Sequence, residues 1–164
     1  MEVMIKLTTT KVMAVAAALT VSGACLGTAT ASASSAMPLT SKWRACDFSI
    51  QQWVDASGDA RGVAYVGPAG DGSLVAKVDL ATAVPNTRYD VRVIQTPRAS
   101  VACAPGQPGV LSGSIQTDGV GAGSVSLRGP VDSEKTGAWV IVERPSAHSQ
   151  TPDEFYTSTF IASI

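Results

Sequence analysis

Apolar and polar residues alternate with a period of two along much of the chain beyond residue 60. In residues 73–80 every second position is leucine, alanine or valine, and Lys77 and Asp79 lie between them. Residues 88–93 repeat the pattern, with Tyr89 and two valines at alternate positions and arginine or aspartate at the others. Alternation with one charged face is typical of a strand that is buried on one side. Both segments are therefore predicted to be half-buried strands.

Six further segments have the composition of short strands: residues 46–54, 61–67, 110–117, 120–128, 137–144 and 155–162. In residues 137–144 both faces are apolar around Trp139, which predicts a central strand buried on both sides. Asp71-Gly72 and Asp118-Gly119 predict hairpin turns between apolar runs, because these residue types tolerate a positive φ angle. Short strands at this spacing favour an all-β sandwich or barrel of about eight strands.

The N-terminal segment has the layout of a secretory signal peptide. Lys6 and Lys11 precede an apolar stretch at residues 12–26, and small residues with A-x-A cleavage sites follow at residues 29–36. Cleavage is expected after Ala33 or Ala36. Residues 1–36 are thus assigned to the signal and its cleavage region, and residues 37–164 to a single domain. The mature protein is expected to be secreted.

Two alternatives for the N-terminus stay open. An uncleaved transmembrane anchor needs about 18 or more apolar residues, whereas this stretch is shorter and contains Thr20, Ser22 and Gly23. A lipoprotein signal would place the lipid on Cys25, although no leucine, valine or isoleucine stands three residues before it. We therefore expect no stable membrane insertion after signal cleavage.

The charge balance argues against nucleic acid as a partner. Removal of Lys6, Lys11 and Glu2 from the chain's 12 basic and 13 acidic residues leaves 10 and 12, without a basic cluster. Nucleic-acid-binding domains usually carry a basic patch or stripe. The expected partner is an extracellular protein, glycan or small ligand.

Two cysteines remain after the signal, Cys46 and Cys103. An exported chain with one such pair is expected to form one disulfide, whereas two free buried thiols would fit a reducing compartment. On the chain-entropy model the bridge stabilises the fold by about 4 kcal/mol. Two cysteines and the single histidine, His148, lack the ligand spacing of a zinc site. No metal or other cofactor is expected.

Residues 84–93, with the sequence VPNTRYDVRV, resemble the P-x-T-x-Y-x-V-x-V run of fibronectin type III domains and, more broadly, of immunoglobulin-like sandwiches. The chain has Ala83 where this family usually has leucine. The resemblance implies an immunoglobulin-like or fibronectin III-like β-sandwich. It also implies that the Tyr89 hydroxyl bonds back to the backbone a few residues upstream, as a tyrosine corner.

A second resemblance lies in residues 114–127, with the sequence SIQTDGVGAGSVSL. This hairpin is similar to those of small exported actinobacterial sandwiches, including the neocarzinostatin-type chromophore carriers. Those proteins carry two disulfides, whereas this chain can form one. The similarity implies the same type of fold and suggests an alternative function, the carriage of a small apolar ligand in a cleft between sheets.

Candidate catalytic residues are few. His148 has serines and Asp153 near it in sequence, but the Pro-bounded polar segment around it is typical of a surface loop, and the chain has no G-x-S-x-G elbow. Its aspartates are scattered over turns and polar strand faces, where solubility and turn geometry account for them. No catalytic residue is assigned. Hydrolysis by a pair of carboxylates stays a less favoured alternative.

The sequence therefore predicts a secreted, non-catalytic binding module. Two long loops are expected to supply the contact, residues 96–109 with Arg98 and residues 145–153 with His148. Trp43 and Trp53 flank the first expected strand, and either one, if exposed, is a candidate for the binding surface. Packing within the domain is the alternative role for both tryptophans.

Overall fold

The computed structural model describes residues 34–55 and 57–164. In these ranges the regular elements are nine strands, and every strand pairing is antiparallel. The strands are β1 (Ser35–Thr40), β2 (Arg61–Pro68), β3 (Ser73–Ala81), β4 (Arg88–Thr96), β5 (Val110–Gln116), β6 (Gly123–Pro130), β7 (Gly137–Arg144), β8 (Glu154–Ser158) and β9 (Ala162–Ser163). The all-β prediction is confirmed.

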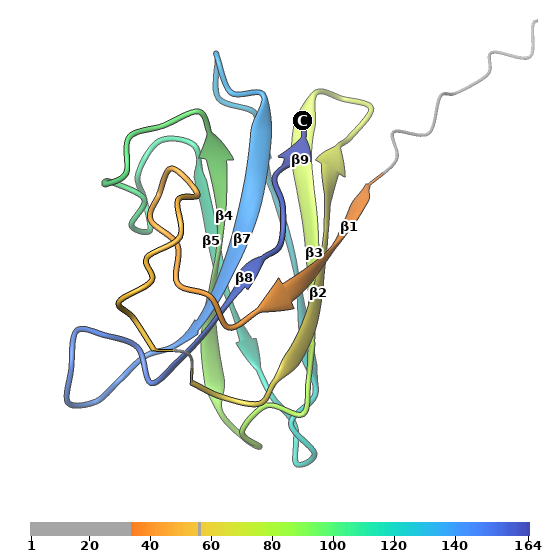
Figure 1. The fold of residues 1–164 in the computed structure, drawn as a ribbon. Coiled ribbons are helices and arrows are strands. Elements are labelled where there is room, and N and C mark those ends of the chain that lie inside the picture. Colours follow the sequence, from red (N-terminus) through yellow and green to blue (C-terminus); the bar gives the residue numbers. More distant parts are fainter. Residues whose placement is uncertain (1–33, 56) are drawn as a thin grey trace, which may run out of the picture. The chain divides into compact units, whose positions relative to one another are not determined.

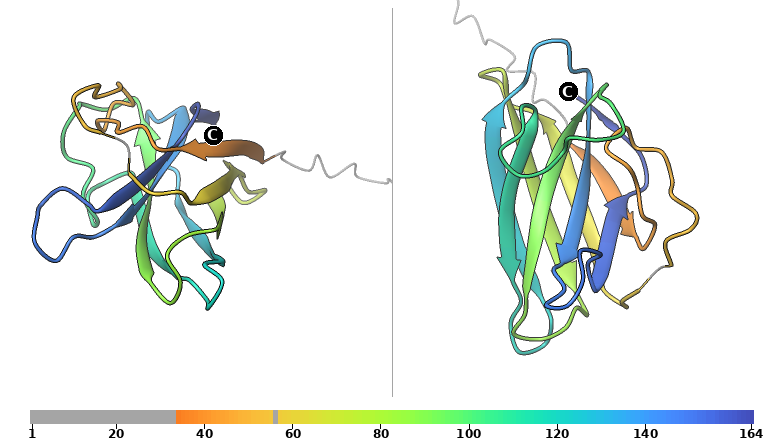
Figure 2. Two further views of the ribbon diagram at one scale, coloured as in Figure 1. Left: turned by 60° about the horizontal axis from the view of Figure 1, so that its bottom comes forward. Right: turned by 90° about the vertical axis from the view of Figure 1, so that its left-hand side faces the viewer.

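The strands form one nearly closed path in the order β5-β4-β7-β8-β1-β2-β3-β6, and β9 pairs with β7 (Figure 1). Strand β1 joins two parts of this sheet. Its first residues pair with β2, and Leu39 and Thr40 pair with β8. The three-stranded part (β2, β3, β6) and the four-stranded part (β5, β4, β7, β8) thereby enclose one core, and Figure 2 shows the arrangement of the strands from two further directions.

Alternate residues from both parts fill this main core. Leu74, Ala76 and Val78 of β3 face Tyr89 and the valines of β4 and β7 across it, and these side chains are almost completely buried. The polar positions between them point outward, as the period of two requires. The half-buried character predicted for residues 73–80 and 88–93 is confirmed.

The prediction of a strand at residues 46–54 is wrong. These residues form turns with one isolated bridge, between Arg44 and Ile50. The Asp47 carboxylate accepts hydrogen bonds from the backbone N–H and hydroxyl of Ser49, and Phe48 has a φ of 75°. Such local bonds compete with a strand ladder. Of its apolar residues, Cys46 is buried and Phe48 packs on a second apolar cluster described below, whereas Ile50 and Trp53 are exposed.

Other strand assignments also differ from the prediction, and β4 extends to Thr96, beyond the expected residues 88–93. The segment expected at residues 155–162 is divided into β8 and β9, and β6 begins at Gly123 because residues 118–122 form the hairpin turn. Asp118 organises that turn: its Oδ1 accepts the N–H groups of Val120 and Ala122, both at 2.9 Å, which holds the pKa of this carboxyl below its usual value. Strand β1 was not predicted, because its residues resemble the small-residue tail of a signal peptide.

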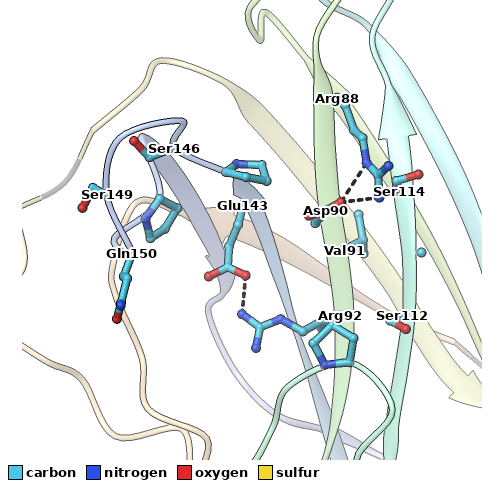
Figure 3. A pocket seen from close by; sticks show the side chains of 14 residues that line it. Arg88, Asp90, Val91, Arg92, Ser112, Ser114, Glu143, Ser146, Ser149 and Gln150 are labelled. Carbon is cyan, nitrogen blue, oxygen red and sulfur yellow. Dashed lines mark hydrogen bonds and ion pairs between the residues drawn. The ribbon is translucent and has the colours of Figure 1, made fainter.

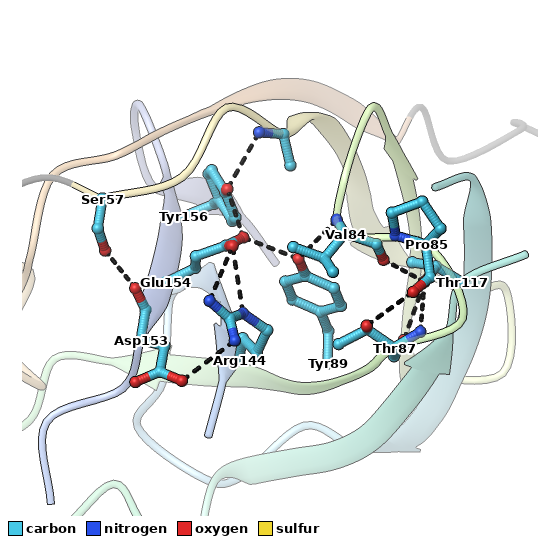
Figure 4. Close-up of polar contacts among 11 residues, drawn as sticks. Ser57, Val84, Pro85, Thr87, Tyr89, Thr117, Arg144, Asp153, Glu154 and Tyr156 are labelled. Carbon is cyan, nitrogen blue, oxygen red and sulfur yellow. Dashed lines mark hydrogen bonds and ion pairs between the residues drawn. The ribbon is translucent and has the colours of Figure 1, made fainter. Parts of the chain in front are cut away.

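A buried polar network ties three connections together at one end of the domain (Figure 4). The Tyr89 hydroxyl accepts the Val84 N–H at 3.1 Å and donates to Glu154 Oε2 at 2.7 Å. Tyr156 donates to the same oxygen at 2.9 Å and accepts the Ala60 N–H at 3.0 Å. The backbone hydrogen bond expected of Tyr89 is thus present, at the point where the chain crosses from the three-stranded to the four-stranded part.

We predict that the mature chain begins at Ser34, by cleavage after Ala33. Cleavage after Ala36 would remove the pairs that Ser35 and Ala36 form with β2, and it would place a charged amino group on the fully buried Met37. A chain starting at Met37 should be less stable by about 1–3 kcal/mol. Mass spectrometry of the N-terminal peptide of the secreted protein measures the site. An N-terminus at Met37 would contradict the prediction.

A second prediction concerns stability at high pH. Burial raises the pKa of Tyr89 to about 12 and raises that of Tyr156 further. The unfolded chain releases these protons near pH 10, so unfolding should become easier as the pH rises from about 10 towards 12, by up to about 1.4 kcal/mol per pH unit for each tyrosine. Tyr89→Phe should reduce this slope and, at neutral pH, cost about 1–3 kcal/mol by leaving the Val84 N–H without a partner.

Urea denaturation at a series of pH values measures both effects. Tyr65→Phe is the matched control, because the Tyr65 side chain lies on the surface of β2 with 39% of its area exposed. Equal slopes in the wild type and Tyr89→Phe would show that the buried hydroxyl does not govern the alkaline transition.

Candidate functional site

The outer face of the four-stranded part changes character along strands β4 and β7. At one end it carries Arg88, Asp90 and Arg92 of β4 and Glu143 of β7. At the other end the same face carries apolar residues, and Ile94, Trp139 and Ile141 form a second buried cluster separate from the main core. The predicted burial of Trp139 on a strand with two apolar faces is confirmed.

Residues 41–55 cover this apolar end; we call them the cover segment. Its Phe48 packs edge-on against Trp139 at a ring distance of 5.6 Å, and its Trp43 packs edge-on against Phe155 of β8 at 5.0 Å. The Trp139 indole N–H donates to the Cys46 carbonyl oxygen at 3.3 Å. The cover segment is therefore held by side-chain packing with few backbone hydrogen bonds to the sheet.

The Cys46–Cys103 disulfide fixes the cover segment to the loop after β4. The two Cα atoms are 5.6 Å apart and the bridge spans 57 residues of sequence. The Cys46 N–H also donates to the Ser100 carbonyl oxygen at 3.2 Å. The predicted pairing is present, although it joins two irregular segments and does not anchor a strand.

A hollow of about 450 Å³ lies between the cover segment and the sheet; we call it the tryptophan hollow. Its apolar lining comprises Trp43, Trp53, Trp139, Ile94, Ile141 and the two disulfide cysteines, and its polar lining includes Arg44, Gln51, Arg92 and Ser100. The Trp53 side chain is 79% exposed, yet its indole N–H donates to Gln51 Oε1 at 3.1 Å. This bond holds the exposed ring in one orientation.

Arg44 adds a cation to the wall of the tryptophan hollow. Its guanidinium lies 3.8 Å from the centre of the Phe48 ring and donates to the Phe48 carbonyl oxygen at 2.9 Å. Its Nε is shielded from solvent and makes no hydrogen bond within the described part of the chain. Burial lowers the pKa of Arg44 from its usual value, although an arginine remains charged under ordinary conditions.

A second hollow, of about 550 Å³, lies over the charged end of the same face (Figure 3). We call it the polar hollow; its lining includes Arg88, Asp90, Arg92, Glu143, Ser112, Ser114, Ser146, Ser149 and Gln150. Figure 3 shows the loop with Ser146 and Gln150 on one side and the side chains of β4 and β5 on the other. Arg88 pairs with Asp90 at 2.9 Å and Arg92 pairs with Glu143, so positive and negative charges balance.

The structure divides the expected site residues among three places. Trp43 and Trp53 meet at the tryptophan hollow, together with the disulfide. Arg98 lines a different hollow, and it braces its own loop by donating from Nη2 to the Pro108 carbonyl oxygen at 3.0 Å. His148 is exposed in the loop of the polar hollow, beside Ser146 and Ser149, but it is not among the lining residues.

Several lining residues were not predicted. Arg92 lines both hollows, and Gln51 orients Trp53. The alternation in residues 88–93 placed Arg92 on a polar face, but no local pattern shows which loop lies above that face. The pairing of Gln51 with Trp53 depends on the turns of the cover segment, which the sequence had suggested to be a strand.

The geometry offers little for catalysis. Asp90 and Glu143 are opposite each other in the β4–β7 register and line the polar hollow, but each carboxylate forms an ion pair with an arginine, Asp90 with Arg88 and Glu143 with Arg92. Asp47, Asp71 and Asp118 have carboxyl pKa values shifted downward by hydrogen bonds in turns, whereas a general acid needs a raised value. In residues 34–55 and 57–164, no three His, Cys, Asp or Glu side chains gather to hold a metal ion, and no helix is long and apolar enough to cross a membrane.

We predict that replacing both bridge cysteines, Cys46→Ala with Cys103→Ala, releases the cover segment while the main core stays folded. The loss of a loop constraint of this length should cost about 4 kcal/mol, and Trp139 should become exposed to water. A red shift of tryptophan fluorescence with unchanged β-type circular dichroism is the expected result. Reduction of the wild type should produce the same shift, and reduction of the double variant should add nothing. If a stable preparation of the double variant lost its β-type circular dichroism spectrum, the prediction that the main core folds without the bridge would be contradicted.

Comparisons with known proteins do not assign the chain to a family. No protein-family model matches it, and no curated protein or solved structure is significantly similar to it.

Proposed function

We propose that this protein is an exported, non-catalytic binding module whose ligand contacts the tryptophan hollow. Export is supported by the signal-like pattern of residues 1–36, most of which lie outside the described residues, and by the Cys46–Cys103 disulfide. The tryptophan hollow lies over the outer face of the four-stranded part, away from the main core.

The observation that carries the proposal is the exposed but oriented Trp53. Trp53 is 79% exposed beside the apolar lining of the tryptophan hollow, and tryptophan is enriched among the residues that dominate binding energy. The bond to Gln51 restricts its ring before any ligand arrives, which lowers the entropy lost on binding. The adjoining volume of about 450 Å³ is within the range of small-ligand pockets.

We further propose that the fold is an immunoglobulin-like or fibronectin III-like sandwich. The three-stranded and four-stranded parts, which enclose a core of alternating side chains, support this assignment. The Tyr89 hydrogen bond at the crossing between them supports it as well. Strand β1, which pairs with both parts, gives the sheet its nearly closed form.

A small apolar ligand, if carried by this protein, has no free space between the two parts of the sheet within the described residues. Side chains from both parts of the sheet fill the space between them. The buried Trp139 lines the tryptophan hollow on the outer face of the sheet. A small apolar ligand would therefore bind outside the main core, under the cover segment. The ion-paired state of Asp90 and Glu143 makes a carboxylate hydrolase the weakest of the three candidates.

We predict that Trp53→Ala weakens ligand retention at least about tenfold, while the fold is unaffected because the side chain is exposed. The full oxidised chain is immobilised and used to capture components of culture medium and cell-envelope extracts, which are identified by mass spectrometry. Trp53→Phe should retain part of the binding. Val120→Ala is the matched control, because Val120 is 77% exposed in the turn before β6. Equal retention by the wild type and Trp53→Ala, or chemical cleavage of the retained species, would refute the proposal.

A further inference from the structure

We infer that the ligand is an uncharged oligosaccharide that lies across both hollows, with one sugar ring on Trp53 and further units in the polar hollow. This inference rests on the proposed function and specifies its ligand. The two hollows share a lining residue, Arg92, on the outer face of β4.

Arg92 forms a fixed junction between the hollows. Its Nη1 donates to the Cys103 carbonyl oxygen at 2.9 Å, and its Nη2 pairs with Glu143. The side chains of Arg92 and Glu143 are only 16% and 14% exposed. A side chain held by two partners is a rigid point on the sheet face, so an extended ligand can cross from one hollow to the other without displacing it.

The polar hollow provides hydroxyl and amide groups and no net charge. The hydroxyl oxygens of Ser146 and Ser149 accept the N–H groups of His148 and Thr151, at 3.2 and 3.0 Å. Since a serine hydroxyl both donates and accepts, each keeps its own hydrogen available to an acceptor on the ligand. Ser112 and Ser114 of β5 add two more hydroxyl groups from the other side.

The charges of the polar hollow are balanced, and the Arg44 guanidinium of the tryptophan hollow is engaged by the ring and carbonyl oxygen of Phe48, so a neutral ligand fits this surface. Arg88 and Asp90 pair with each other at 2.9 Å and stay partly exposed, with 66% and 40% of their side chains accessible. Such a pair offers donors and acceptors side by side, which suits neighbouring hydroxyl groups, whereas its opposite charges cancel the field that would attract an ion. Sugar hydroxyls fit this lining better than phosphate or sulfate groups do.

The tryptophan hollow provides the second half of a sugar site. Because the Trp53 N–H is occupied by Gln51, the ring presents its apolar faces. The negative π-face of an aromatic ring favours the slightly positive C–H groups that cover one side of a pyranose ring. Trp53 can therefore support one sugar unit while the polar hollow binds the hydroxyl groups of the next ones.

A peptide fits the same surface less well. Extended peptides gain affinity by adding a strand to a free sheet edge. Both hollows instead lie over the outward side chains of β4, β5 and β7; β4 and β7 are already paired on both sides, and Ser112 and Ser114 of β5 present side chains and not a strand edge to the polar hollow. A peptide here would leave its backbone N–H and C=O groups without ladder partners.

The test uses the full oxidised chain and titration calorimetry with cello-, chito-, malto- and manno-oligosaccharides, from dimers to hexamers. One series should bind, with affinity that rises with length, and the affinity should change less than about twofold between about 0.05 and 0.5 M NaCl because no ion pair with the ligand is formed. Trp53→Ala and Ser112→Ala with Ser114→Ala should each weaken binding at least about tenfold. Lys77→Ala, on the outer face of β3, should leave it unchanged.

The outcomes separate the two levels of the proposal. If no oligosaccharide binds but a protein or an apolar small molecule is retained in a Trp53-dependent manner, the sugar inference is wrong and the binding module stands. Binding of a sugar that the serine variant does not weaken also overturns the inference, because the polar hollow would then be unused. If neither the sugars nor the captured extracts show Trp53-dependent binding, both proposals fail. Matched titrations with free polysaccharide and with a glycoprotein bearing the same sugar distinguish the source of the glycan.

Discussion

The Cys46–Cys103 bridge is the constraint on which the candidate site depends. The backbone hydrogen bonds of the cover segment lie mostly within the segment itself, as those between Ala45 and Ser49 and between Trp43 and Gln51 do, so its attachment to the sheet depends on side-chain packing and the disulfide. The bridge holds it over Ile94, Trp139 and Ile141, which would otherwise form an apolar patch on the surface of the sheet. The contacts that cover this patch therefore also form the wall of the tryptophan hollow.

The inner face of strands β4 and β7 belongs to the main core, and their outer face lines the two hollows. Their inward residues, Tyr89, Val91, Val93, Val140 and Val142 among them, belong to the main core that the three-stranded part completes. Their outward residues build both hollows. Because successive side chains of a strand point to opposite faces, changes on the outer face leave the inner packing largely untouched. A ligand-binding surface can thus vary on this domain without loss of the core, provided that the cover segment stays attached.

The position of the hollows also changes where binding is to be sought. The sequence predicted contact through two loops, with Arg98 and His148, and through Trp43 or Trp53 if exposed; Arg98 braces its own loop, and His148 lies beside the polar hollow without lining it. The surface that combines Trp53, hydroxyl groups and the Arg92–Glu143 ion pair is formed by the sheet face together with the cover segment. The loops contribute as walls: residues 145–152 border the polar hollow, and the loop containing Cys103 borders the tryptophan hollow.

The sequence alone determined the all-β class, most strand positions, the hairpin turn at Asp118, the hydrogen bond of Tyr89 and the pairing of Cys46 with Cys103. The class, the strands, the turn and the disulfide follow from a period of two, from local turn chemistry and from there being a single pair of cysteines after residue 36, whereas the hydrogen bond of Tyr89 was implied by the resemblance to fibronectin type III domains. Tertiary structure alone decided that residues 46–54 are a cover and not a strand, that β1 joins both parts of the sheet, and that Trp53 and Arg92 share one surface. Alternation shows which residues lie on the same face of a strand, but what covers that face is set by contacts between segments far apart in sequence, as Phe48 and Trp139 are.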